Sequence, residues 1–137
     1  MKNLKFLPVL LLFACSDSES VQPKKHNWDT YLGDKYSSQY SNLDEINSDN
    51  VQNLQVAWTY SSNDKDPNNR SQIQCNPLII DGVLYGTSAG LKLFALAADT
   101  GEELWVFDPF DNNFGSFGMG VNRGLVFYED ENKRRLF

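Results

Sequence analysis

The sequence predicts an all-β fold, and three observations lead to that prediction. Short apolar runs recur about every ten residues, and tight-turn residues separate them. Asp81-Gly82 divides two of these runs, and an Asp-Gly pair between apolar runs is a strong sequence signal for a β-hairpin. Beyond residue 27, no window of about 11 residues places its apolar residues at helical spacing.

The expected strands follow one another along the chain with short turns between them. Asp99-Thr100-Gly101-Glu102 is the expected turn before the fifth strand, and Asp108-Pro109 ends that strand because proline cannot donate to a ladder. The glycine-rich residues 114–120 indicate a loop. The expected strands are residues 56–60, 77–80, 83–87, 93–96, 104–107, 124–128 and 134–137.

Two of these assignments carry a further expectation. The weak alternation in residues 124–128 indicates a strand that is buried on both faces. Residues 44–54 have room for one short helical turn, with Ser48 or Asp49 as its cap.

Composition restricts the class of protein. The chain has 137 residues and 41% hydrophobic residues, which suits one domain and excludes a disordered chain. Its net charge of -6 argues against a nucleic-acid partner, because phosphates require a basic surface. One histidine and two cysteines are too few for a His/Cys metal cluster or a disulfide framework.

The first residues have the pattern of an export signal. Lys2 and Lys5 precede the short apolar run 6–14, which is about half the length of a membrane span. The residues that end at Cys15 resemble a bacterial lipobox, in which the cysteine becomes the lipidated first residue. We therefore expect a signal peptide at 1–14, a lipid anchor and flexible tether at 15–27, and a folded part at 28–137. This implies an exported, periplasm-facing protein. The serine after Cys15 favours the outer membrane over the inner one.

Residues 95–105 resemble the tryptophan-docking repeat of quinoprotein β-propellers, which is usually A-L-D-A-x-T-G-x-x-x-W. Gly101 would supply the positive φ that the turn between the third and fourth strand of a blade needs. Trp105 would lie between blades and bury an apolar surface worth about 2–3 kcal/mol. Ala97 stands where the repeat usually has aspartate.

Residues 28–58 resemble the opening segment of the pyrroloquinoline quinone (PQQ)-dependent alcohol and glucose dehydrogenases, W-x-x-Y-G-G-D-x-x-x-x-R-Y-S-x-L-x-x-I-N-x-x-N-V-x-x-L-x-x-A-W. The resemblance extends over residues 28–137. It implies an eight-bladed β-propeller, of which this chain would supply the opening segment and the first one to two blades. We expect such a truncated portion to be inactive by itself.

The same resemblance implies three cofactor contacts. Residues 121–125 match a V-N-R-G segment in which the arginine, here Arg123, pairs with a carboxylate of the quinone. Gly124 would let the backbone approach the ligand. Gln74 stands where the family has a glutamate that meets the cofactor, and its amide keeps hydrogen-bonding capacity without the charge. Phe117 stands where adjacent cysteines stack on the quinone, and it offers an aromatic face or serves as a loop anchor.

Other polar features carry no expected chemistry. Cys75 is expected to pack as a small hydrophobic side chain and not to act as a reactive thiol, because no activating base is recognisable beside it. The acidic runs 64–66 and 129–131 lack the spacing of a calcium loop and indicate solvated turns. Gly90 stands about where the glucose-oxidising branch carries a histidine. No metal ligand or catalytic residue is expected in the chain, and the resemblance implies calcium ligands and a carboxylate base beyond residue 137.

The function that follows from the resemblance is oxidation of an alcohol or an aldose sugar. PQQ and Ca²⁺ would be the cofactors, and ubiquinone or cytochrome c would accept the electrons. The alternative is a non-enzymatic propeller lipoprotein with PQQ-like repeats that acts as an envelope assembly scaffold. A secreted carbohydrate-binding β-domain is a third, remoter reading. The opening segment and the residues around Arg123 favour the enzyme.

Overall fold

The computed structural model describes residues 27–111, 121–131 and 133–137. Within these ranges the secondary structure is almost entirely strand, which confirms the all-β expectation. The strands are β1 (Leu78–Ile80), β2 (Val83–Thr87), β3 (Leu93–Ala97), β4 (Glu103–Phe107), β5 (Phe127–Asp130) and β6 (Lys133–Leu136).

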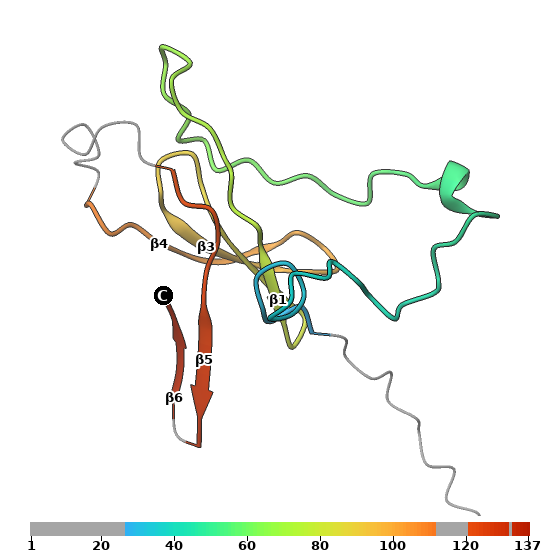
Figure 1. Ribbon diagram of the computed structural model, residues 1–137. Helices are drawn as coiled ribbons and strands as arrows, with labels where there is room; N and C mark the ends of the chain where they lie inside the picture. The colour runs from blue at the N-terminus through green and yellow to red at the C-terminus, as the bar shows by residue number, and fades with distance from the viewer. Residues whose placement is uncertain (1–26, 112–120, 132) are drawn as a thin grey trace, which may run out of the picture.

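The first four strands form one antiparallel sheet in the order β1-β2-β3-β4, and β5 pairs with β6 in a separate hairpin (Figure 1). Four consecutive antiparallel strands are the unit from which a propeller blade is built. The described part of the chain is therefore consistent with one blade and the beginning of another in a partial propeller.

The turn between β1 and β2 forms for a local reason. Asp81 and Gly82 have φ angles of 51° and 80°, and two positive φ angles match the primed turn that joins the strands of a tight hairpin. Ile80 pairs with Val83 across this turn, so the Asp-Gly signal marks the hairpin correctly.

The core joins the four-stranded sheet to the β5–β6 hairpin. Leu78, Ile80 and Leu125 are 1%, 3% and 5% exposed and form one buried cluster. The ion pair between Arg134 of β6 and Asp81, 2.8 Å, connects the same two units at the surface. Because both charges are solvent-exposed, the pair orients the hairpin more than it stabilises it. Partly buried side chains around the cluster are Cys75, Tyr85, Leu93, Phe127 and Leu136.

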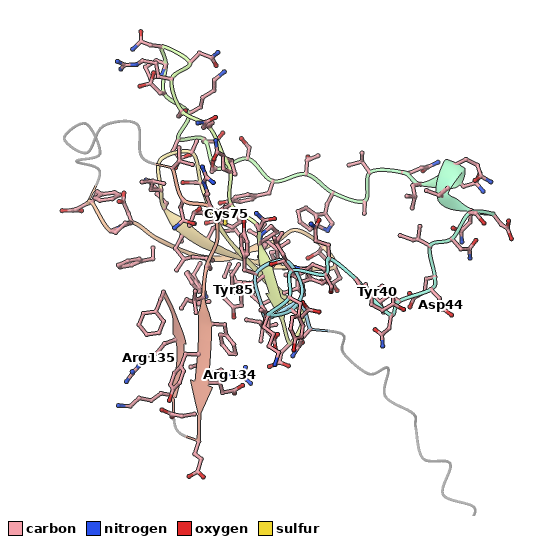
Figure 2. The ribbon with its side chains drawn as sticks, in the orientation of Figure 1. Tyr40, Asp44, Cys75, Tyr85, Arg134 and Arg135 are labelled. Carbon is pink, nitrogen blue, oxygen red and sulfur yellow. The ribbon has the colours of Figure 1, made fainter. Side chains whose placement is uncertain are left out.

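The strand expected at residues 56–60 is absent. A strand requires a neighbouring backbone, and none of the described strands lies alongside this segment. It belongs instead to an amino-terminal arm, residues 28–62, part of which extends away from the sheet (Figure 1). Tyr40 and Asp44 lie on that extended part (Figure 2).

The strand expected at residues 124–128 begins later, at Phe127, although Val126 and Phe137 still exchange two backbone hydrogen bonds of 2.9 Å. The expected burial on both faces is wrong, because Val126 and Tyr128 are 63% and 48% exposed. Phe127 and Leu136 pack against the buried cluster, whereas Val126 and Tyr128 lie on the opposite face of the hairpin, which is open among the described residues.

The helical turn expected in residues 44–54 is the 3-10 helix η1 (Val51–Asn53). Asn50, rather than Ser48 or Asp49, precedes it. The Asn50 side chain accepts a hydrogen bond from the Asn47 amide and donates one to the Glu45 carbonyl, so it braces the loop before the helix. No helix in the described part of the chain has the length and hydropathy of a membrane span.

Candidate functional site

Two stretches that the sequence marks as cofactor contacts meet in space. Asn76 and Gly124 form an isolated parallel bridge. The Asn76 amide donates to the Arg123 carbonyl at 3.0 Å, and the Asn76 side chain Nδ2 donates to the same oxygen at 3.3 Å. The bridge brings the segment that contains Gln74 beside the segment that contains Arg123, although they are far apart in the chain.

Arg123 is exposed, and so is Gln74. Arg70 and Arg134 are each held by a carboxylate, whereas the guanidinium of Arg123 has no ion-pair partner within the described ranges. A guanidinium in this state is available to a carboxylate that comes from elsewhere. Phe117 lies outside the described residues, as does Cys15.

Gly124 has a structural role in its own contacts. A Cβ at this position would lie 2.7 Å from Cδ2 and 3.1 Å from Cε2 of the Tyr31 ring. The space beside the Gly124 Cα is therefore filled by the aromatic ring of the amino-terminal arm. The Gly124 amide donates to Oδ1 of Asn122 at 2.8 Å, which closes a local turn around Arg123.

Cys75 lies beside this bridge and packs against the buried cluster of Leu78, Ile80 and Leu125. Its side chain is half-buried and lines an open cavity of about 540 Å³ on one face of the sheet. The wall is largely apolar, which suits a thiol in a packing role. Its larger side chains are Trp58, Tyr60, Ile73, Pro77, Leu84, Phe94 and Leu96.

The acidic run at residues 64–66 contains a braced carboxylate rather than a solvated turn. The half-buried Asp64 accepts hydrogen bonds from the Ser88 hydroxyl, from Ser62 Oγ at 2.7 Å and from the Gly90 amide at 3.1 Å. A Cβ at Gly90 would lie 2.6 Å from Asp64 Oδ2, so the carboxylate occupies the space beside this glycine. A Ser-x-Asp sequence and a distant Ser-x-Gly turn were the only sequence signals for this contact.

The described residues contain no group of three or more His, Cys, Asp or Glu side chains that would hold a metal ion. Asp66 instead pairs with Arg70, and the hydrogen bond from that guanidinium is the main cause that lowers the pKa of Asp66. The Arg70 side chain is 63% exposed, so the pair makes at most a small contribution to stability.

Trp105 lies on β4 and faces the β5–β6 hairpin. Its ring centroid is 6.0 Å from that of Tyr85, and it lines a cavity of about 440 Å³ together with Phe127 and Leu136 of the hairpin. The side chain is 41% exposed, so its burial is incomplete within the described part of the chain. Arg134 and Arg135, which are labelled in Figure 2, line the same cavity from β6.

Gly101 is covered by a different tryptophan, which the sequence analysis did not single out. A Cβ on Gly101 would lie 2.5 Å from two atoms of the Trp58 ring. Trp58 Nε1 also donates to the Ala98 carbonyl at 3.2 Å, so the indole lies on the β3–β4 turn. Gly101 has a φ of 74°, and its amide donates to the Ala97 carbonyl at 2.8 Å.

Tyr60 makes a further contact between the arm and the sheet. Its ring lies 5.0 Å from that of Phe94, and its hydroxyl donates to Oε2 of Glu103 at 2.7 Å. Burial raises the pKa of Tyr60 to about 12, and the hydrogen bond and negative charge of Glu103 act in the same direction.

This shift predicts a pH dependence at the arm. Because the folded state favours the neutral phenol, Tyr60 contributes stability fully below its ordinary pKa of 10.0, and this contribution is lost as the pH rises toward about 12. The check is an ultraviolet titration of tyrosinate, taken as the difference between the protein and its Tyr60→Phe variant. We expect Glu103→Gln, which removes the charge, to move the midpoint back toward 10.0. A difference curve that is already centred near 10.0 in the unsubstituted protein would contradict the assignment.

Comparison with known proteins identifies the family. The family model described as "PQQ: Glucose/ethanol/alcohol dehydrogenase, beta-propeller domain" matches residues 28–137. The chain is 34% identical over 116 residues to the quinoprotein glucose dehydrogenase of Escherichia coli (strain K12), which covers 82% of this chain and 15% of that protein.

Two alcohol-dehydrogenase relatives agree with this match. The chain is 48% identical over 106 residues to the dehydrogenase subunit of the alcohol dehydrogenase (quinone) of Gluconobacter oxydans (strain 621H), covering 74% of this chain and 13% of the relative. It is 30% identical over 106 residues to the quinohemoprotein alcohol dehydrogenase of Comamonas testosteroni, and the match covers 75% of this chain and 14% of that protein. The chain thus spans only a small part of the length of these relatives. By its sequence and its strands, it belongs to the PQQ-dependent glucose/ethanol/alcohol dehydrogenase β-propeller family.

Proposed function

We propose that the protein containing this chain is a PQQ-dependent dehydrogenase that oxidises an alcohol or an aldose sugar and passes the electrons to ubiquinone or cytochrome c. The observation that carries the proposal is the bridge between Asn76 and Gly124. It places the segment with Gln74 beside Arg123, whose guanidinium is exposed and has no described ion-pair partner.

The residues present suit a carboxylate-bearing quinone. The planar guanidinium of Arg123 would hold a carboxylate through two parallel charge-assisted hydrogen bonds. The amide of Gln74 would add a neutral hydrogen bond without a charge of its own. PQQ, when bound, supplies the two-electron acceptor for the reaction. The role of this chain is to bind and orient one side of that group.

Calcium is the second cofactor in the proposal. Ca²⁺ takes six to eight oxygen ligands, and these are commonly carboxylates and carbonyls. In the proposal its ligands and the catalytic base lie beyond residue 137, as the family resemblance implies.

The proposed location is the bacterial cell envelope, with the protein exported and held at the outer membrane by a lipid on Cys15. Residues 1–14 have the charge and apolar pattern of a lipoprotein signal, and residues 15–27 are polar enough to serve as a tether. Mass spectrometry of the mature amino-terminal peptide tests this location. A peptide that starts at lipidated Cys15 supports it, and an unmodified or uncleaved peptide contradicts it.

The central experiment measures PQQ binding by the whole protein and by an Arg123→Ala variant. Removal of the guanidinium is expected to weaken PQQ binding about 10- to 100-fold, because hydrogen bonds to charged groups are worth about 1.5–3 kcal/mol. Quenching of tryptophan fluorescence reports the Kd. Dye reduction with PQQ and Ca²⁺ over a panel of alcohols and aldoses then reports the substrate class.

Arg70→Ala is the matched control, since Arg70 is also a surface arginine but is paired with Asp66. Its Kd for PQQ is expected to equal that of the unsubstituted protein. Failure of the unsubstituted whole protein to bind PQQ would overturn the enzyme proposal and leave the non-enzymatic envelope scaffold as the better account.

A further inference from the structure

The carbonyl of Arg123 is held by one residue through two hydrogen bonds. The backbone amide of Asn76 donates to it at 3.0 Å and the side-chain Nδ2 of Asn76 at 3.3 Å. A carbonyl oxygen has two lone pairs, so Asn76 supplies a donor for each of them. Asn76 as a residue is half-buried, whereas its side-chain hydrogen bond to the Arg123 carbonyl is exposed to solvent.

The residues on either side of Arg123 are also restrained. The Gly124 amide donates to Asn122 Oδ1 at 2.8 Å, and Gly124 lies against the ring of Tyr31. The backbone around Arg123 is therefore held by two other segments of the chain, residues 76 and 31. Its side chain by contrast is exposed and has no ion-pair partner among the described residues.

We infer that Asn76 is a positioning residue for Arg123 and sets the peptide unit from which the guanidinium reaches the quinone carboxylate. An arginine side chain loses considerable rotamer entropy when a ligand orders it. A backbone that is already oriented lowers the total conformational entropy that is lost on binding. This inference rests on the proposed function. The competing account is that Asn76 only leads the chain into strand β1, which starts at Leu78, in which case its effect would be independent of Arg123.

A double-mutant cycle in the whole protein separates these two accounts. The unsubstituted protein, Asn76→Ala, Arg123→Ala and the double variant are titrated with PQQ in the presence of CaCl₂, and tryptophan fluorescence reports each Kd. We expect Asn76→Ala to weaken binding about 3- to 10-fold, the worth of one hydrogen bond. In the Arg123→Ala background the same substitution is expected to have no further effect, because residues that act through one another are not additive.

Asn76→Ser keeps a short hydrogen-bond donor and is expected to recover part of the lost affinity. Asn68→Ala, in an exposed loop, is the matched control and is expected to leave the Kd unchanged. Thermal unfolding of each variant shows whether the fold is retained at the temperature of the titration, and Asn76→Ser replaces Asn76→Ala in the cycle if the alanine variant is unfolded there.

The outcomes distinguish the inference from the proposal beneath it. An equal loss from Asn76→Ala in both backgrounds, or no loss in either, overturns the positioning role while PQQ binding by the unsubstituted protein still supports the enzyme. Absence of PQQ binding by the unsubstituted protein overturns the proposed function and this role together.

Discussion

Replacement of Leu78 with alanine is expected to lower the local stability of the sheet by about 2–5 kcal/mol. Leu78 is 1% exposed and belongs to the buried cluster with Ile80 and Leu125, so the substitution removes apolar contacts and leaves a cavity. Because Phe127 and Leu136 of the β5–β6 hairpin pack on this cluster, the loss extends to the contact between the two sheets.

Hydrogen exchange of the backbone amides in β1 and β2 measures this effect in the whole protein, since protected amides report the free energy of local opening. The expected acceleration is about 30-fold or more. Leu104→Ala is the matched control, because it is the same substitution at a side chain that is 49% exposed on β4. Similar acceleration in both variants would show that Leu78 does not have the packing role assigned to it.

Replacement of Gly101 with alanine is expected to destabilise the β3–β4 turn by about 2–4 kcal/mol, for two separate reasons. The φ of 74° lies in the left-handed region, which costs an L-residue with a side chain about 1–2 kcal/mol. The added Cβ would also lie 2.5 Å from the Trp58 ring, and displacement of that indole would break its hydrogen bond to Ala98.

The two causes can be separated by a second substitution. In a Trp58→Ala background, Gly101→Ala is expected to cost only the backbone strain, because the ring that it would meet is absent. Thr100→Ala in the same turn is the control and is expected to cost less than about 1 kcal/mol, since Thr100 contributes one 3.3 Å hydrogen bond to the Glu102 amide. Exchange of the Ala97 and Gly101 amides provides the measurement. An equal cost with and without Trp58 would contradict the steric part of the explanation.

The turns and the six strands were predictable because each depends on neighbouring residues in the chain. Asp81-Gly82 adopts the positive φ angles that a two-residue hairpin needs, and Gly101 supplies the positive φ in the turn before β4. Apolar residues on either side of such turns have few alternatives to pairing with each other. The family resemblance used the same local signals, and it extended them to the residues around Arg123.

Segment 56–60 shows where this reasoning fails. Its aromatic and β-branched residues have strand propensity, but a strand also requires a partner backbone, and propensity does not supply one. Trp58 and Tyr60 are instead held by side-chain contacts with Ala98, Gly101 and Glu103. The contacts of Asp64 were likewise not predictable from its neighbours in the chain. In the sequence it belongs to a charged run, whereas in the fold its carboxylate accepts hydrogen bonds from Ser88 and Gly90.

By itself, the sequence determined most of the strand and turn pattern, the family, and the identity of Gln74 and Arg123 as candidate contacts. Only the tertiary structure decided that Asn76 holds the Arg123 carbonyl, that Tyr31 covers Gly124, and that Trp58 covers Gly101. The physical reason is that backbone angles and apolar periodicity are set by adjacent residues, whereas these contacts join segments that are distant in the chain. Such contacts depend on which surfaces meet when the strands assemble.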